Sequence, residues 1–401
     1  MKSLGAIVTS HENELIALRR LLHTQPEPSG GEYLTTEILV ERLRVEGLLP
    51  QVLATGTGLV CDISMDPDVA PDPTAMPAVA IRADIDGLAM EDLSAAAYRS
   101  RTPGLAHACG HDVHTAAVLG AGLTLLDVRR SAPQHAMVRL IFEPAEEAVP
   151  GGAVDVVAEG WLEDITAIFG VHCDPKLDVG QLGLRAGALT SAADQFEITL
   201  QGPGGHTARP RQTIDLVRWT ARIADRLWEA TQVRAHEPVI LVFGSVHTGA
   251  AANVIPASAT LRGSFRTADR QTWAMGEQLV RDALTDVLAS SDIGDQPEWH
   301  LDYIRGLPPV VNDAATTALV GEVIVEQFGA DALADTPQSA GGDSFAWYTE
   351  LIPGTYVRLG THDSDSLRPM LDLHSATFDV DERAIAIGAK LLAACALAAL
   401  S

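Results

Sequence analysis

The sequence has few lysines and no long uninterrupted apolar run. Only three of its 28 basic residues are lysine, and 53 acidic residues give a formal net charge of −25. A surface this acidic repels phosphate backbones and anionic lipids, so we expect neither a nucleic-acid partner nor a membrane partner. The longest apolar stretch, residues 385–400, is interrupted by Lys390 and is typical of a buried helix.

Cysteine is also scarce. Four cysteines scattered along 401 residues argue against a disulfide scaffold and favour a reducing compartment. The first apolar stretch is broken by Ser10, His11 and Glu12, so it does not read as a secretory signal. We therefore expect a cytoplasmic protein. Hydrophobic residues make up 47% of the chain, which is globular composition, and the length favours two domains.

Apolar segments that read as buried strands alternate with helical segments over much of the chain. Three such strands, at residues 78–87, 138–147 and 167–175, run from apolar residues into polar ones, and helices are predicted at 115–126 and 152–160. This alternation predicts an α/β fold with a mostly parallel sheet flanked by helices. In such sheets ligands bind beyond the carboxyl ends of the strands.

The pattern changes near residue 190. Strand patterns at 194–202, 239–246, 259–266 and 298–304 combine with helical patterns at 214–230 and 272–288 in the order β-α-β-β-α-β, which is typical of a ferredoxin-like α+β domain. The earlier character returns after residue 305. We therefore predict one domain from residues 1–189 and 306–401 and an inserted domain at 190–305.

The start of the last helix carries a possible capping signal. Asp379 precedes Glu382 by three residues, the spacing of a capping box, in which both side chains bond to the first backbone N–H groups. The sequence therefore predicts that the helix begins at this pair.

The segment HACGHDVH, residues 107–114, concentrates three histidines, a cysteine and an aspartate. The thiolate of Cys109 and the imidazole of His111 suit zinc and related divalent ions. The same pair would also serve a nucleophilic cysteine with a histidine base. A buried cysteine beside a turn glycine explains the pattern equally well, so this segment alone leaves all three interpretations open.

Further metal-binding side chains lie at strand ends or element junctions of the same predicted sheet. Glu147 and His172 each follow the apolar part of a predicted strand, and His374 lies in a polar segment before the last helix. Each is unremarkable alone. With Cys109 and His111 they make five candidate ligands, which suits a pair of divalent ions that polarise a carbonyl and deprotonate a water.

Two carboxylates are candidates for supporting roles. Glu146 precedes Glu147, and adjacent carboxylates can divide metal binding from proton transfer when their environments differ. A solvated acidic face is the simpler interpretation. Asp84 and Asp86 follow the first strand, and Asp86 is a candidate to orient an imidazole ligand, with a plain turn as the alternative.

The inserted domain carries three more candidates. GGHTARP, residues 204–210, is a glycine-rich turn that contains His206. Asn253 and Arg266 flank the third predicted strand and are candidates to hold a substrate carboxylate. Structural roles explain each of these three residues at least as well on the local sequence.

Taken in order, the motifs ADIDG, HACGHDVHTA, FEPAEE, GVHCDP, GGHTARP, NVIP, GGDSF and LHSATFDVDE resemble those of the dinuclear aminoacylase and carboxypeptidase family of metallopeptidases. The cysteine in HACGHD is typical of its amidohydrolase branch, which includes hippurate hydrolases, auxin-conjugate hydrolases and N-acyl-amino-acid amidohydrolases. With RRLLHTQPE at residues 19–27, the resemblance covers nearly the whole chain.

The resemblance implies an α/β catalytic domain and an inserted lid domain, through which we expect a homodimer. It implies two divalent metal ions per subunit, zinc or manganese, with cobalt or nickel as alternatives. The implied metal ligands are Cys109, His111, Glu147, His172 and His374.

The resemblance also implies roles for the other candidates. Glu146 would be the general base, and Asp86 would orient a ligand from behind. His206 would stabilise the oxyanion, in some relatives in the site of the partner subunit. Asn253 and Arg266 would help to hold the substrate.

Three places depart from the pattern of the family. Asp343 and Ser344 stand where relatives usually have Glu-Asp, Glu143 stands where glutamine is common, and residues 148–152 replace a glycine run. The first departure bears on substrate preference more than on chemistry.

We predict a metal-dependent amidohydrolase that cleaves the acyl amide of N-acyl amino acids or similar small conjugates. Three alternatives are kept open. They are a carboxypeptidase or dipeptidase of the same family, a cysteine hydrolase using Cys109 and His111, and a metal-binding relative without activity.

Overall fold

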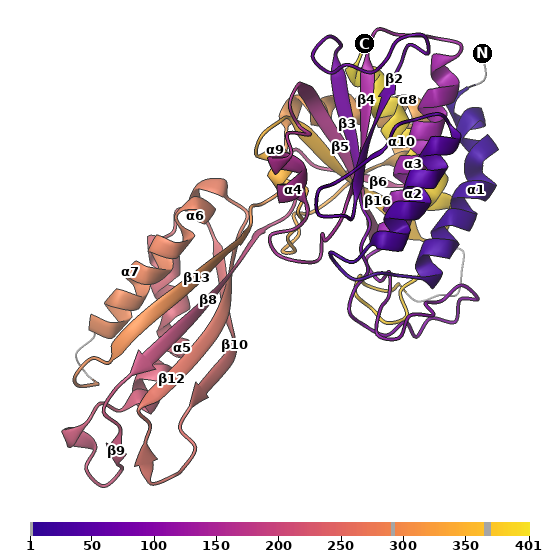
Figure 1. Cartoon of the computed structure of the whole chain (residues 1–401). Helices are drawn as coiled ribbons and strands as arrows, with labels where there is room; N and C mark the ends of the chain where they lie inside the picture. The colour runs from indigo at the N-terminus through magenta and orange to yellow at the C-terminus, as the bar shows by residue number, and fades with distance from the viewer. Residues whose placement is uncertain (1–2, 290–292, 365–369) are drawn as a thin grey trace. The chain divides into compact units, whose positions relative to one another are not determined.

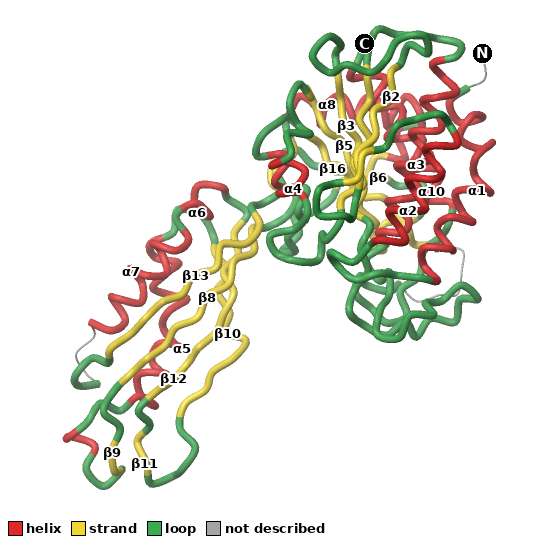
Figure 2. Tube along the Cα trace, in the orientation of Figure 1, coloured by secondary structure: helices red, strands yellow, loops and turns green. Residues whose placement is uncertain are grey.

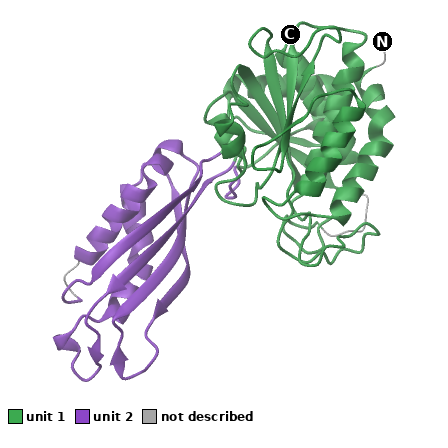
Figure 3. Cartoon of the chain, in the orientation of Figure 1, with its two compact units in different colours: residues 1–189, 310–337, 343–401 green, residues 190–309, 338–342 purple. Residues whose placement is uncertain are grey.

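The structure, a computed structural model, describes residues 3–289, 293–364 and 370–401. The chain divides into two compact units (Figure 3). Unit 1 comprises residues 1–189, 310–337 and 343–401, and unit 2 comprises 190–309 and 338–342. The predicted insertion was 190–305, so unit 2 extends four residues further and also takes the short segment 338–342.

Unit 1 contains these elements in chain order: α1 (Leu4–Thr24), α2 (Tyr33–Val45), β1 (Gln51–Val52), β2 (Leu59–Ser64), β3 (Ala78–Asp84), α3 (His111–Arg129), β4 (Met137–Glu143), α4 (Ala153–Ala158), β5 (Ile165–Asp178), β6 (Leu182–Leu184), β7 (Gly187–Ala188), β14 (Val311–Asn312), α8 (Ala314–Phe328), β15 (Leu333–Asp335), α9 (Ala346–Thr349), β16 (Gly354–His362) and α10 (Arg383–Ala399).

One sheet forms the centre of unit 1 (Figures 1 and 2). It has eight strands in the order β1-β2-β4-β3-β5-β16-β6-β15. The neighbours β4/β3, β3/β5, β5/β16 and β6/β15 are parallel, and the other three pairs are antiparallel. The predicted α/β fold with a mostly parallel sheet is confirmed. The carboxyl ends of β3, β4, β5 and β16 therefore meet at one edge.

The sheet is buried on both faces because alternate side chains of its strands enter different cores. In β3, Val79 and Ile81 belong to the core on the side of α1, α3 and α10, whereas Ala78 and Ala80 pack in the core on the side of α4 and α9. Figure 1 shows these helices on opposite sides of the sheet. Packing on both faces therefore holds these strands, and with them the polar residues at their ends, in defined positions.

Three local predictions differ from the structure. Helix α3 begins at His111, not at residue 115, so His111 lies in its first turn. Strand β5 continues to Asp178, so His172 lies within the strand and not after it. The predicted capping box is wrong, because α10 begins at Arg383 and its N-cap residue Glu382 makes no side-chain cap hydrogen bond.

Unit 2 contains β8 (Ala192–Gln201), β9 (Gly205–His206), α5 (Leu216–Arg234), β10 (Val239–Thr248), β11 (Val254–Ile255), β12 (Ser258–Thr267), α6 (Arg270–Ala274), α7 (Gly276–Ala289) and β13 (Glu298–Leu307).

Four antiparallel strands form the sheet of unit 2, in the order β10-β12-β8-β13. With the chain order β8-α5-β10-β12-α7-β13, this is a ferredoxin-like arrangement. The apolar residues of α5 and α7 pack with one face of the sheet around Trp219, Leu227 and Phe265. The short strands β9 and β11 pair with each other beyond the end of the sheet (Figure 2).

The chain leaves and re-enters unit 1 through two adjacent strands. Strand β7 pairs antiparallel with β14, and the N–H of Leu189 donates a hydrogen bond to the carbonyl of Val310 at 2.9 Å. None of the helices within the described ranges is long and apolar enough to cross a membrane.

Candidate metal centre

The turn before α3 presents Cys109 and His111 toward the carboxyl edge of the sheet. Gly110 between them has φ +88°, in the left-handed region, and a Cβ there would lie 2.7 Å from Cys173 Sγ. Only glycine fits this turn without displacing Cys173. Both Cys109 and His111 are buried. The backbone conformation of Gly110 therefore sets the positions of Cys109 and His111 on either side of it.

The ring of His111 is oriented from behind by Asp86. Its Nδ1 lies 3.0 Å from both the carboxylate Oδ1 and the backbone carbonyl of Asp86, so Nδ1 carries the proton and donates. Its buried Nε2 makes no hydrogen bond to any residue in the described ranges. A buried ring nitrogen without a partner is costly in a protein interior, and a metal ion would satisfy it.

His172 has the same arrangement on strand β5. Its Nδ1 donates to the carbonyl of Cys173 at 2.8 Å, and its Nε2 lies 3.5 Å from Cys109 Sγ. Burial and the nearby Arg358 hold the pKa of His172 well below its ordinary value. The ring is therefore neutral, with its lone pair toward the cysteine, which is the form that binds a metal ion.

Glu147 and His374 complete the predicted ligand set. His374 Nε2 lies 3.3 Å from Glu147 Oε1, and the backbone N–H of His374 donates to the carbonyl of Ala108 at 2.8 Å. His374 has φ +61°, in the left-handed region that residues other than glycine seldom adopt. The structure thus brings the loop before α10 against the turn before α3.

The five predicted ligands form one continuous cluster. In three overlapping groups the candidate ligand atoms all lie within 4.8 Å of one another: Cys109, His111 and His172; Cys109, Glu147 and His374; His111, Glu146 and Glu147. Thiolate, imidazole and carboxylate together suit zinc, manganese, cobalt or nickel. This donor set fits divalent metal ions, and its size fits two of them.

Glu146 lies beside this cluster in a different environment from Glu147. Its carboxylate is buried, and Oε1 accepts a hydrogen bond from the backbone N–H of Ser344 at 3.1 Å. Burial, and then the carboxylates of Asp343 and Glu147, raise the pKa of Glu146 well above its ordinary value. A carboxylate of raised pKa both accepts and returns a proton more readily near neutral pH.

The sequence motifs did not predict the buried ionic network that lies near Glu146. Arg82, in the middle of β3, donates to Glu143 Oε2 at 2.7 Å, to Asp84 Oδ2 at 2.8 Å and to Ser344 Oγ at 2.9 Å. Ser344 Oγ in turn donates to Glu143 Oε1. Two of the positions that depart from the family pattern, Glu143 and Ser344, are therefore in direct contact. The sequence signal for this network is Arg82, a charged residue inside the otherwise apolar strand β3.

His114 shows why nearness alone does not make a ligand. Asp84, His111 and His114 also lie close enough to hold an ion. However, His114 Nδ1 donates to Asp84 Oδ1 at 2.6 Å, and its Nε2 accepts the backbone N–H of Cys173 at 2.8 Å. Both nitrogens are already used, so we assign His114 to the support of the site.

In unit 2 the structure brings together two of the three predicted residues. Strand β9 ends at His206, which pairs in register with Val254 next to Asn253, and both His206 and Asn253 are exposed. His206 Nδ1 accepts the N–H of Ala208 at 3.1 Å, which leaves Nε2 as a donor.

Arg266 lies at the other end of unit 2 from Asn253. It is near the end of β12, where it donates to the carbonyl of Ala340 at 2.8 Å. The eight residue-to-residue steps from Ser258 to Arg266 extend about 27 Å along the strand. The prediction that Asn253 and Arg266 grip one carboxylate together is therefore wrong within a single chain.

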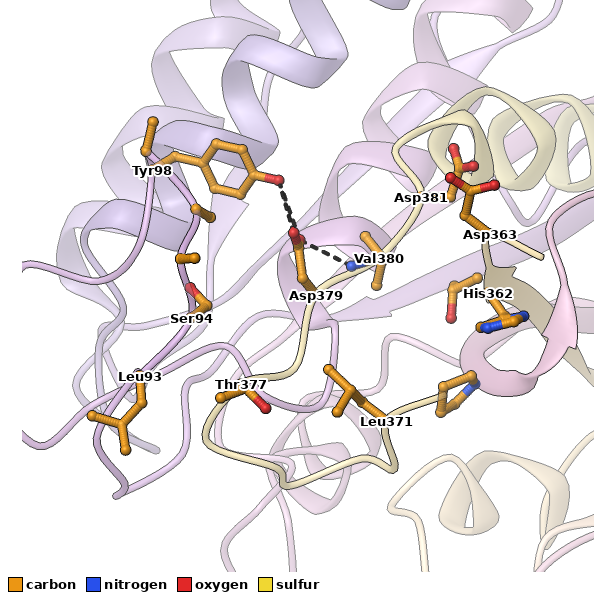
Figure 4. Close-up of a pocket in the computed structure, with 15 residues that line it drawn as sticks. Leu93, Ser94, Tyr98, His362, Asp363, Leu371, Thr377, Asp379, Val380 and Asp381 are labelled. Carbon is orange, nitrogen blue, oxygen red and sulfur yellow. Dashed lines mark hydrogen bonds between the residues drawn. The ribbon is translucent and has the colours of Figure 1, made fainter. Parts of the chain in front are cut away.

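A cavity of about 650 Å³ in unit 1 adjoins the segment that carries His374. It is lined by residues 93–98, 361–363 and 371–381 in part, including Tyr98, Leu371 and Asp379 (Figure 4). None of the five predicted ligands is among the lining residues that the structure describes.

The model of the peptidase family M20/M25/M40 matches residues 80–398. The chain belongs to this family. This M20 chain is 35% identical over 376 residues to the N-acetyl-L-cysteine deacetylase of Bacillus subtilis, covering 93% of the chain and 85% of that relative. The resemblance seen in the sequence motifs is confirmed.

A Rhodococcus jostii protein that carries the name glutamate–cysteine ligase 2-3 is 42% identical over 385 residues. The match covers 96% of this M20 chain but 46% of that relative, so the chain spans about half the length of that protein. A solved Bacillus subtilis structure, described as a dinuclear metal binding peptidase from the M20 family, superposes with a TM-score of 0.82 at 29% identity, covering 98% and 99% of the two chains.

Family membership makes the protein a metal-dependent hydrolase of amide or peptide bonds. The predicted enzyme class is thereby confirmed. The cysteine-hydrolase alternative is set aside, and so is that of a binding protein without activity.

Proposed function

We propose that this M20 hydrolase removes the acyl group from N-acyl amino acids, with N-acylated cysteine as the first substrate to test. The convergence of five donor side chains with the buried Glu146 is the observation that carries the proposal. One relative bears on the substrate, because the Bacillus subtilis protein is named an N-acetyl-L-cysteine deacetylase. A carboxypeptidase or dipeptidase activity is the alternative.

In this proposal Cys109, His111, Glu147, His172 and His374 hold two divalent ions, zinc or manganese, with cobalt or nickel as alternatives. Such ions lower the pKa of a water molecule and polarise the amide carbonyl when bound. Burial raises the pKa of the Cys109 thiol well above its ordinary value, so this thiol needs a strong positive charge beside it to become a ligand.

Glu146 moves the proton. The Ser344 N–H holds one carboxylate oxygen, Oε1, and Oε2 lies 3.9 Å from His111 Nε2, at the edge of the ligand cluster. From there Glu146 accepts a proton from the attacking water and later delivers it to the leaving amine. Asp86 keeps the His111 ring oriented throughout.

His206 supplies a hydrogen bond to the oxyanion, for which its exposed Nε2–H is suited. We propose that two copies pair through unit 2, so that the histidine acts in its own site or in that of the partner subunit. Asn253 and Arg266 are proposed to contact substrate, separately and not as one clamp. The proposed location is the cytoplasm.

The test compares Glu146→Gln with Glu147→Gln. We expect Glu146→Gln to reduce turnover of N-acetylcysteine by about a thousandfold while metal content is unchanged, because only proton transfer is removed. Glu147→Gln is expected to lower metal content as well. Both variants keep the size of the side chain, so each is the control for the other.

Metal dependence and substrate class are tested together. Protein stripped by a chelator and reloaded with zinc, manganese, cobalt or nickel is assayed on N-acyl amino acids and on dipeptides. We expect activity to disappear with the chelator and to return with a divalent ion. We expect the reloaded protein to hydrolyse N-acyl amino acids faster than dipeptides. Faster hydrolysis of dipeptides would replace the proposal by the peptidase alternative.

A further inference from the structure

Arg19 of helix α1 is fully buried although it carries a charge and belongs to no part of the proposed site. Its Nε donates a hydrogen bond to Asp112 Oδ2 at 2.7 Å. Its Nη2 donates to Asp379 Oδ1 at 3.2 Å, and its Nη1 donates to Glu382 Oε1 at 3.3 Å. A buried guanidinium is tolerated only where several carboxylates pair with it. The three carboxylates therefore compensate the buried charge of Arg19 and are held together by it.

The partners come from the two segments that carry metal ligands. Asp112 follows His111 in the first turn of α3. Asp379 and Glu382 follow His374 in the segment that leads into α10. One rigid, planar group on α1 thus contacts both segments from behind.

Neighbouring side chains hold this arrangement in place. Tyr98 donates a hydrogen bond to Asp379 at 3.1 Å (Figure 4), and its ring centroid lies 4.7 Å from the Arg19 guanidinium carbon. On α1, one turn after Arg19, His23 Nδ1 lies 2.8 Å from Asp112 Oδ2. The orientation of the guanidinium is therefore fixed on both sides.

We propose that Arg19 is a positioning residue that sets the separation between the Cys109–His111 turn and the His374 loop, and thereby the affinity of the site for metal. This inference rests on the proposed assignment of metal ligands. A direct backbone hydrogen bond also joins the two segments, from the N–H of His374 to the carbonyl of Ala108. That bond fixes one point, whereas the fork of Arg19 fixes the directions of both segments.

The neighbouring Arg20 offers a matched control. It lies on the same helix, contacts the same Glu382 and stacks near the same Tyr98 ring. However, its side chain is half exposed, and its carboxylate partner is Glu382 and not Asp112. Arg20→Gln therefore removes an arginine from the same place without removing the link between the two segments.

The experiment measures zinc and manganese affinity by competition with a chromophoric chelator, on chelator-stripped Arg19→Gln, Arg19→Lys and Arg20→Gln. Thermal unfolding of the same samples is recorded without metal. We expect Arg19→Gln to lose at least tenfold in affinity for one ion and Arg20→Gln to stay within twofold of wild type. Arg19→Lys is expected to lie between them, because a lysine keeps the charge but not the fork.

A second variant decides the matter if Arg19→Gln does not fold. Asp379→Asn weakens the link to the His374 loop and leaves the Arg19–Asp112 pair intact, so it is expected to weaken metal binding with little change in the fold. Wild-type affinity in folded Arg19→Gln, or in Asp379→Asn if the former is unfolded, overturns the proposal.

Parallel variants keep this outcome distinct from failure of the proposed function. His111→Ala and His374→Ala test the ligand assignment directly. If both leave metal binding unchanged, the proposed metal centre is wrong, and the role of Arg19 falls with it. If both abolish binding at one ion while Arg19→Gln binds normally, only the positioning role is wrong.

Discussion

The predicted site residues occupy two environments that differ in burial. In unit 1, Cys109, His111 and His172 are buried, and carboxylate or backbone groups behind the two rings fix their orientation. In unit 2, His206 and Asn253 are exposed and contact mainly their own backbone surroundings. The first group is preorganised by a core. In the proposed function the second group gains its partners only on contact with substrate or a second copy, so the two groups should respond differently to mutation.

The largest effect is expected for a buried ligand. His111→Ala removes an Nε2 that has no hydrogen-bond partner among the described residues. If this nitrogen holds a metal ion as proposed, several kcal/mol of transition-state stabilisation are lost with it, so kcat/KM should fall by about a thousandfold or more. Metal analysis should show at least one ion lost. His11→Ala on α1, a histidine paired with Asp127, is the control and should change neither quantity. Full metal content in His111→Ala would contradict the assignment.

The exposed histidine should behave differently. In the proposed mechanism His206→Ala removes one oxyanion donor, so kcat should fall by about a hundredfold to a thousandfold with unchanged metal content. His247→Ala, another exposed histidine of unit 2, is the control. Mixing His206→Ala with Glu146→Gln tests whether copies share sites, because activity returns only if the histidine acts in the partner subunit. A kcat equal to wild type in His206→Ala would remove this residue from the mechanism.

The buried network below Glu146 should show a smaller loss that a second change repairs. Glu143→Gln leaves the buried Arg82 short of a charged partner, so the free energy of unfolding should fall by about 3 kcal/mol. Ser344→Asp added to that variant places a carboxylate beside Arg82 again and should recover much of the loss. Urea denaturation of both single variants and the double variant measures the coupling, and additive losses would show that positions 143 and 344 are independent.

The smallest effect is expected for an exposed ion pair of unit 2. Glu197 contacts Arg262 across β8 and β12, and the side chain of Arg262 is 66% exposed. Glu197→Gln should lower the free energy of unfolding by less than about 1 kcal/mol, because water already solvates both charges. The same urea experiment measures it. A loss as large as that of Glu143→Gln would erase the contrast between the two units.

The sequence was sufficient for the α/β fold and for candidate ligands, because alternation of elements and donor chemistry are local properties. Features that depend on contacts between residues far apart in the sequence could not be predicted in this way. The capping box failed because Arg19, far away in the chain, takes Asp379 and Glu382 as partners. The distance between Asn253 and Arg266 depends on a strand lying extended between them, and the left-handed backbone of His374 depends on its contact with Ala108.

The pairing of β7 with β14 has a consequence for how this architecture can vary. Leu189 and Val310 are hydrogen-bonded neighbours, so the ends of the inserted segment meet at one point of unit 1. Each doubling of the length of a segment closed in this way costs only about 0.6 kcal/mol in chain entropy. Natural variation can therefore lengthen or shorten the insertion between these two residues at little cost in chain entropy, whereas exchange of the whole insertion must also accommodate residues 338–342, which belong to unit 2.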